Sequence, residues 1–132
     1  MTSYGLTEKE WVAAMSEGRE ILITCARDKK GSLITYSDLA AKIKSVRFEC
    51  YERGFFHLLE LISINCNNAG KGLLSALVVH KSDNKPGEGF YDLARRLGRK
   101  TSNKDSCWIK ELEKVRKDFE AQHQVDNFCK AA

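Results

Sequence analysis

The sequence has no uninterrupted apolar run near the roughly 20 residues that a transmembrane helix requires. Its first residues, MTSYGLTEKEW, also lack the basic and apolar regions of a secretory signal peptide. These two absences argue against a membrane-spanning protein and against an exported one. We therefore expect a cytoplasmic location and no membrane partner.

Cysteine pairs at metal-ligand spacing are missing as well. No CxxC pair occurs, and the cysteines are odd in number and widely spaced, so neither a disulfide framework nor a zinc site is indicated. We expect buried thiols in a reducing compartment. The five positions are Cys25, Cys50, Cys66, Cys107 and Cys129.

Local motifs for catalysis are absent too. The histidines His57, His80 and His123 stand singly, and nothing at metal-ligand spacing accompanies them. The glycines of PGEG and NAGKG lack the strand-before and helix-after arrangement of a phosphate-binding loop. A nucleophile, a base and an orienting acid can still converge in space. Our expectation is nevertheless a protein that is not an enzyme and has no metal and no cofactor.

The sequence does contain enough apolar material for one core. It has 132 residues, of which 42% are hydrophobic and 30% charged, and a chain of this length buries roughly two-thirds of its unfolded surface. We expect a single domain over residues 1–132, with residues 1–5 and 123–132 flexible. The net charge of +4 is compatible with an anionic partner without requiring one.

Capping residues and helical periodicity organise the first half of the chain. Thr7 and Glu10 match the T-x-x-E capping box, and the apolar spacing after them predicts a helix over about residues 7–29, stopped near Gly31. The β-prone segment 32–35 predicts a short strand. Thr35 and Asp38 repeat the capping pattern and predict a second, short helix.

The third helix is predicted by an apolar face that starts near residue 52 and ends near Asn68. The stretch from Gly70 to Phe90 follows it, and we expect this stretch to be the centre of the fold. Its apolar run LLSALVV is short and bounded by glycine, which favours a buried strand over residues 73–80. The segment SDNKPGEG then predicts an exposed, wing-like loop or hairpin tip.

Two further helices are predicted in the last third of the chain. The first is short, begins at Phe90 and ends at Gly98, and its spacing favours a core role for Phe90 and Tyr91 over the stacking of bases. The second is long and solvated, with a single docking stripe. That stripe consists of Trp108, Leu112, Val115 and Phe119.

The order helix, strand, helix, helix, strand, loop is that of a winged helix-turn-helix, in which the third helix often enters the DNA major groove. We therefore expect an α+β fold that is mainly helical, with a winged-helix-like core, a short sheet and a long C-terminal helix. The third helix has few of the donors that base edges and phosphates require, because residues 49–60 include three glutamates and one arginine, Arg53.

The segment LITYSDLAAKI at residues 33–43 resembles the opening of the helix-turn-helix in the alkyltransferases that repair methylated guanine. That family needs a reactive cysteine within a Pro-Cys-His-Arg motif. No such run occurs in this chain, where Cys66 lies in INCNNAG. The local similarity therefore implies no alkyl transfer.

A wider resemblance covers about residues 33–119. The segments TYSDLA, GKGLLSALVVHK, PGEGFYDLA and CWIKELEKV resemble a group of small bacterial proteins of largely unassigned role, whose related segments also occur beside nuclease domains. The resemblance implies a compact winged-helix-like α+β domain from bacteria or mobile elements. It supplies no active-site residues.

Two functions remain open at this point. We expect first a non-catalytic interaction protein, similar to an immunity protein or an antitoxin, that binds a protein partner such as a toxin and occludes it stoichiometrically. The alternative is a winged-helix DNA-binding regulator that contacts phosphates through the loop and the basic fourth helix. The candidate partner-binding residues are Arg53, His57, Lys81, Lys85, Arg95, Arg96, Arg99 and Lys100. The oligomeric state is left open.

Overall fold

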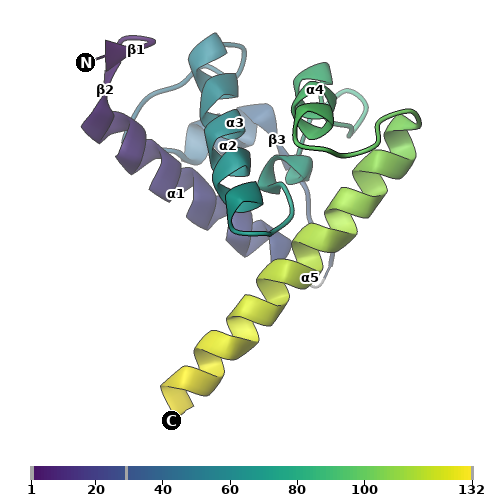
Figure 1. Ribbon diagram of the computed structural model, residues 1–132. Coiled ribbons are helices and arrows are strands. Elements are labelled where there is room, and N and C mark those ends of the chain that lie inside the picture. The colour runs from purple at the N-terminus through teal and green to yellow at the C-terminus, as the bar shows by residue number, and fades with distance from the viewer. Residues whose placement is uncertain (1, 29, 132) are drawn as a thin grey trace.

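The protein is mainly helical, with short strands, in the computed structural model shown in Figure 1. The structure describes residues 2–28 and 30–131, with side chains for 4–28 and 30–120. In chain order the elements are β1 (Thr2–Ser3), β2 (Leu6–Thr7), α1 (Glu8–Ala26), β3 (Ile34–Thr35), α2 (Tyr36–Lys42), α3 (Arg53–Asn68), the 3-10 helix η1 (Leu74–Leu77), β4 (Val78–Val79), α4 (Glu88–Arg96) and α5 (Lys104–Ala131).

Both ends of the described chain contain regular secondary structure. β1 pairs antiparallel with β2, and Tyr4 and Gly5 between them both have positive φ, as the tight turns that join hairpin strands require. At the other end, the backbone of α5 is helical up to Ala131 and projects past the other elements in Figure 1. Met1, Ala132 and the side chains from residue 121 onward, including Cys129 and His123, lie outside the described part of the chain.

The helix starts predicted from capping residues are confirmed. The Thr7 hydroxyl accepts from the backbone N–H of Glu10, and the Glu10 carboxylate accepts from the backbone N–H of Thr7. The Thr35 hydroxyl accepts in the same way from Asp38. α1 ends at Ala26, three residues before the predicted end at residue 29, and Gly31 (φ 73°) belongs to the turn that follows. Short-range hydrogen bonds therefore specified these helices locally.

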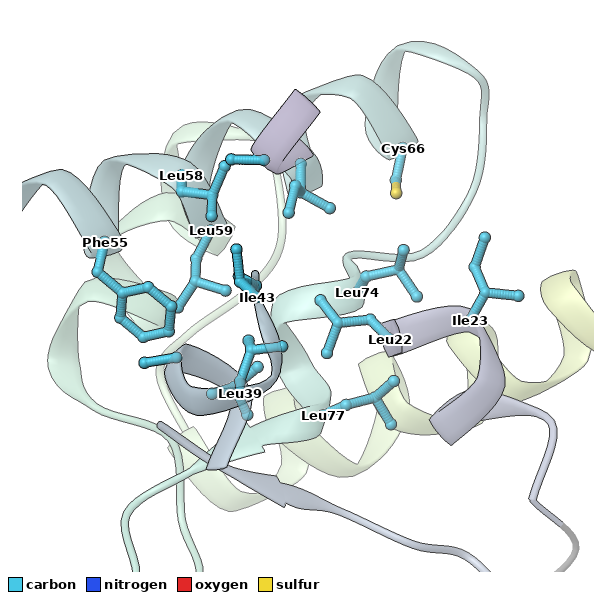
Figure 2. Packing of buried hydrophobic residues seen from close by; sticks show 14 of the residues in the cluster. Leu22, Ile23, Leu39, Ile43, Phe55, Leu58, Leu59, Cys66, Leu74 and Leu77 are labelled. Carbon is cyan, nitrogen blue, oxygen red and sulfur yellow. The ribbon is translucent and has the colours of Figure 1, made fainter. Parts of the chain in front are cut away.

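The core lies where α1, α2, α3 and the 3-10 segment meet, and Figure 2 shows their apolar side chains pointing toward one another. α5 closes the cluster with Val115 and Phe119, both completely buried. A second, smaller cluster joins α4 to α5, and Phe90 and Tyr91 are buried there at 5% and 7% exposure. The core role predicted for these two aromatics is confirmed.

The prediction of a strand over residues 73–80 is wrong for most of that run. Residues 74–77 form the 3-10 helix η1, and the strand β4 contains only Val78 and Val79. Every residue from Leu73 to Val79 is buried, so the run has no polar face whose period could distinguish strand from helix. Its position as the centre of the fold agrees with its contacts to α1, α3 and α5.

Side chains from neighbouring helices satisfy the backbone of this central segment. The Ser63 hydroxyl accepts from the backbone N–H of Ser75 at 3.1 Å, and the indole N–H of Trp108 donates to the Ala76 carbonyl at 2.8 Å. The Glu111 carboxylate accepts from the N–H of Leu73 at 2.8 Å. Buried backbone groups need such partners, and here helices rather than a neighbouring strand supply them.

The sheet is correspondingly small. β3 and β4 pair in parallel, Ile34 with Val78 and Thr35 with Val79. The loop after β4 closes on itself through the N–H of His80, which donates to the Lys85 carbonyl at 2.9 Å, and α4 follows directly. The predicted exposed loop is therefore present. In the described part of the chain, no strand returns from it to form a hairpin.

Candidate functional site

Three of the basic residues predicted to contact a partner are engaged in ion pairs with neighbouring acids. Lys85 lies 3.4 Å from Asp105, Arg95 lies 3.3 Å from Asp92, and Arg96 lies 3.0 Å from Glu60. Each of these pairs is largely open to solvent. Water and salt screen such pairs, so each contributes little to stability, but together they reduce the positive field expected of a phosphate-binding patch. The remaining exposed members of the set are Arg53, Lys81 and Lys100.

Arg99 has an internal role. Its side chain is 19% exposed, and its guanidinium donates to the Glu111 carboxylate at 3.1 and 3.2 Å. The same group also donates to the side-chain oxygen of Asn67 and, at 3.0 Å, to the Leu97 carbonyl. These contacts join the end of α4 to α3 and α5. The hydrogen-bonding groups of Arg99 are therefore engaged within the fold.

His57 belongs to an aromatic cluster near the N-terminal hairpin. Its ring centroid lies 5.1 Å from that of Tyr4 and 5.3 Å from that of Trp11. The side chain is half-buried, while Arg53, one turn earlier on α3, is exposed. The outer face of α3 thus combines aromatic side chains with charged ones, and only the mixed charge was predicted from the sequence.

A pocket of about 320 Å³ lies beside this face, between α3, the loop after β4 and the start of α4. Its volume is at the small end of the range for ligand sites, and its walls are mainly apolar. Phe56 stands at its edge with 43% of its surface exposed. The lining residues are Tyr36, Phe56, Leu59, Glu60, Ser75, His80, Gly87, Glu88, Gly89, Phe90 and Leu93.

Tyr36 holds one wall of the pocket in place. Its hydroxyl accepts from the backbone N–H of Gly87 at 3.0 Å, and its ring lies 4.7 Å from that of His80 and 5.9 Å from that of Phe56. A methyl group on Gly87 would come within 2.9 Å of His80 Nε2, so glycine permits this close approach. The three rings and the Gly87 backbone form a continuous surface.

Burial raises the pKa of the Tyr36 phenol, and the hydrogen bond from Gly87 and the nearby Asp83 are smaller influences in opposite directions. The phenol therefore stays neutral at physiological pH. Its oxygen accepts from Gly87, which leaves its own proton available to a ligand. The acidic side chains among the lining residues are Glu60 and Glu88.

Sequence reasoning missed this pocket. The sequence singles out neither Tyr36 nor Phe56, and it predicts His80 only as the last residue of a strand. The residues come from four separate segments, and only the tertiary fold brings them together. The one local signal was PGEG after an apolar run, because paired glycines often mark a close approach of backbone to side chains.

Replacing Tyr36 by phenylalanine is expected to lower the free energy of unfolding by about 1 kcal/mol at pH 7, because the Gly87 N–H loses its partner. The raised pKa means that the folded state holds the phenolic proton more tightly than the unfolded state. The contribution of the protonated Tyr36 phenol to the stability of the fold is thus complete below the ordinary tyrosine pKa of about 10, and it is lost as pH rises above that value. Urea unfolding at pH 7 and pH 11 should therefore show the gap between wild type and Tyr36→Phe narrowing.

Tyr51→Phe is the matched control, since Tyr51 is 75% exposed. Its stability should equal that of the wild type at pH 7. A Tyr36→Phe deficit that stayed constant or widened at pH 11 would contradict the assigned direction of the Tyr36 shift.

Three of the cysteines are poor nucleophiles. Burial raises the pKa of Cys25, Cys66 and Cys107, which favours the protonated form. Cys66 and Cys107 are buried as predicted, whereas Cys25 and Cys50 are half-buried. Among the described side chains, no cluster of three His, Cys, Asp or Glu residues is arranged to hold a metal ion.

None of the helices in the described residues is both long and apolar enough to cross a bilayer. Comparisons of the chain with protein-family models, with curated proteins and with solved structures found no match.

Proposed function

We propose that this chain is a non-catalytic protein-binding module, similar in action to an immunity protein or an antitoxin, that works in the bacterial cytoplasm. It acts by binding one partner protein stoichiometrically and covering that partner's working surface. The contact surface consists of the outer face of α3, the loop after β4 and the pocket between them.

The observation that supports this proposal is the pocket with Phe56 at its edge. Protein interfaces are centred on a few aromatic or basic anchors that enter apolar pockets and are surrounded by polar residues. Here an exposed aromatic, an apolar hollow and a rim of charged side chains occur together. The ion pairs of Lys85, Arg95 and Arg96 fit a mixed-charge protein surface better than a phosphate-binding one.

The winged-helix-like core is part of the same proposal. The order of α1, β3, α2, α3 and β4 followed by an exposed loop supports it, and the loop supplies Lys81 to the proposed surface.

The alternative function is that of a DNA-binding regulator. It is supported by Lys81 and Lys100, exposed cations that form no ion pair within the described residues. It requires duplex binding that weakens steeply with salt. Failure to bind duplex DNA at low salt would remove it.

A photo-crosslinking amino acid in place of Phe56 is expected to give one discrete adduct in the native host, and the same substitution at Ile109 none. Ile109 is the matched control, because it is 51% exposed on α5 and lines no part of the pocket. With the purified partner, Phe56→Ala should weaken a one-to-one complex by about tenfold or more, as the loss of an interface anchor does.

Ile109→Ala should leave that affinity unchanged. Two results would overturn the proposal: no adduct from position 56 in any growth condition, or a purified complex whose affinity is equal for wild type and Phe56→Ala.

A further inference from the structure

We infer that the pocket beside α3 receives a lysine or arginine side chain of the partner. This inference rests on the proposed protein-binding function and specifies the chemistry of its central contact. Aromatic rings on its walls and carboxylates at its mouth are the two observations from which it is drawn.

The walls present aromatic surface from three segments. Phe56 of α3 meets Tyr36 of α2 edge to face, with ring centroids 5.9 Å apart, and Phe90 of α4 contributes a further ring to the lining. The face of an aromatic ring attracts cations, and the attraction grows when water is excluded. The aliphatic stem of a lysine or arginine would lie along Leu59 and Leu93, as such stems do on apolar surfaces.

The polar side chains of the lining are two carboxylates, the His80 imidazole and the hydroxyls of Tyr36 and Ser75, and the two carboxylates favour a cation over an anion. Glu60 and Glu88 line the pocket from α3 and from the first turn of α4, and neither lysine nor arginine lines it. Carboxylates accept hydrogen bonds and do not donate them. An anionic or carboxylate-bearing ligand would meet two like charges, whereas an ammonium or guanidinium group would meet two acceptors.

Both carboxylates already have surface partners that an incoming cation can replace. Glu60 pairs with Arg96 at 3.0 Å, where the arginine side chain is 55% exposed, and Glu88 pairs with Lys104 at 2.5 Å. Exposed pairs of this kind are weak, because water solvates each member well. A cation in the pocket would meet the aromatic faces as well as the carboxylates, and the attraction to the rings offsets part of the cost of removing water from the cation.

The size of the pocket also indicates a single side chain. A volume of about 320 Å³ is at the lower limit for small-molecule sites, and drug-sized ligands occupy larger clefts. The end of one long side chain fits, while a folded domain element does not. The rest of the partner would then lie over Phe56 and the loop after β4.

The test uses the full chain and short amides of single amino acids, followed by NMR. We expect the Nα-acetyl methylamides of lysine and arginine to shift the signals of Tyr36, Phe56 and Gly87 saturably, with millimolar dissociation constants. The norleucine amide, which has a similar stem and no charge, should bind at least about tenfold more weakly, a difference that corresponds to one charged contact.

Charge variants test the role of the two carboxylates, Glu60 and Glu88. Glu60→Gln and Glu88→Gln should each reduce the preference for lysine over norleucine, and the double variant should abolish it. Asp92→Asn is the matched control, because it removes an exposed carboxylate of α4 that does not line the pocket. It should leave the preference unchanged.

The outcomes separate this inference from the proposed function. Equal binding of norleucine and lysine amides, or tighter binding of tetramethylammonium than of either basic amide, overturns the inference. A partner that crosslinks at position 56 but binds Glu60→Gln, Glu88→Gln and the double variant as tightly as wild type also overturns it, while the protein-binding function stands. Selective lysine binding without any protein adduct supports the pocket chemistry and contradicts the proposed function.

Discussion

Replacing Glu111 by alanine is expected to lower the free energy of unfolding by about 3–5 kcal/mol, because it leaves a guanidinium largely buried without its counter-charge. Glu111 is 4% exposed although it is charged. Its carboxylate accepts twice from Arg99 and once from the backbone N–H of Leu73. One substitution therefore removes the partner of an ion and the partner of a buried N–H group.

Urea unfolding followed by far-UV circular dichroism would measure this loss. Glu60→Ala is the matched control: it breaks the Arg96–Glu60 pair, whose side chains are 55% and 35% exposed, and it should cost no more than about 1 kcal/mol. The double variant Arg99→Met with Glu111→Leu should recover much of the stability, because it leaves no unpaired charge. A Glu111→Ala protein within 1 kcal/mol of wild type would show that the pair is unimportant.

The Arg99–Glu111 pair shows why the sequence wrongly predicted Arg99 to be an exposed partner-binding residue. Arg99 stands with Arg95, Arg96 and Lys100, and a run of cations predicts a solvated face. Burial of Arg99 depends on Glu111, a residue on another helix, which local patterns do not report. The burial of Glu111 could have been predicted from its spacing, because it lies four residues from both Cys107 and Val115 and therefore on the apolar side of α5.

The elements that the sequence predicted well are those with local causes. α1 and α2 begin after threonines whose hydroxyls accept a hydrogen bond from the backbone N–H three residues later. Four consecutive residues are therefore enough to predict each of these helix starts. The stretch from Leu73 to Val79 is the opposite case. Its apolar character predicted burial correctly, but its conformation depends on Ser63 and Glu111, which accept from backbone N–H groups at Ser75 and Leu73.

The pocket was beyond local reasoning for the same reason. A tyrosine at the start of a helix and a histidine after a strand have ordinary local roles. Their rings lie 4.7 Å apart only because β3 and β4 pair in parallel, with Thr35 opposite Val79. The next residues, Tyr36 and His80, therefore leave the sheet side by side. Knowledge of that register would have predicted their contact.

Replacing Gly72 by alanine is expected to lower the free energy of unfolding by about 3 kcal/mol, at the upper end of the cost of overpacking a well-filled core. A Cβ atom at this position would lie 2.8 Å from Val115 Cγ2 and 2.9 Å from the Val115 backbone nitrogen. Rotation of the valine side chain relieves the first contact but not the second. α5 would have to move away from the central segment, and the hydrogen bond from the Gly72 N–H to Asp118 would stretch from 2.8 Å.

Two other glycines provide a graded control for this effect. At Gly18, a Cβ would lie 3.0 Å from Cδ1 of Ile62, a side-chain end that can rotate, so Gly18→Ala should cost less than Gly72→Ala. At Gly89 no heavy atom lies within 4 Å, and alanine in α4 should change stability by less than about 1 kcal/mol, on the stabilising side. Urea unfolding of the three variants should rank them in this order. Equal stability of Gly72→Ala and wild type would mean that α5 does not pack against Gly72 in the folded protein.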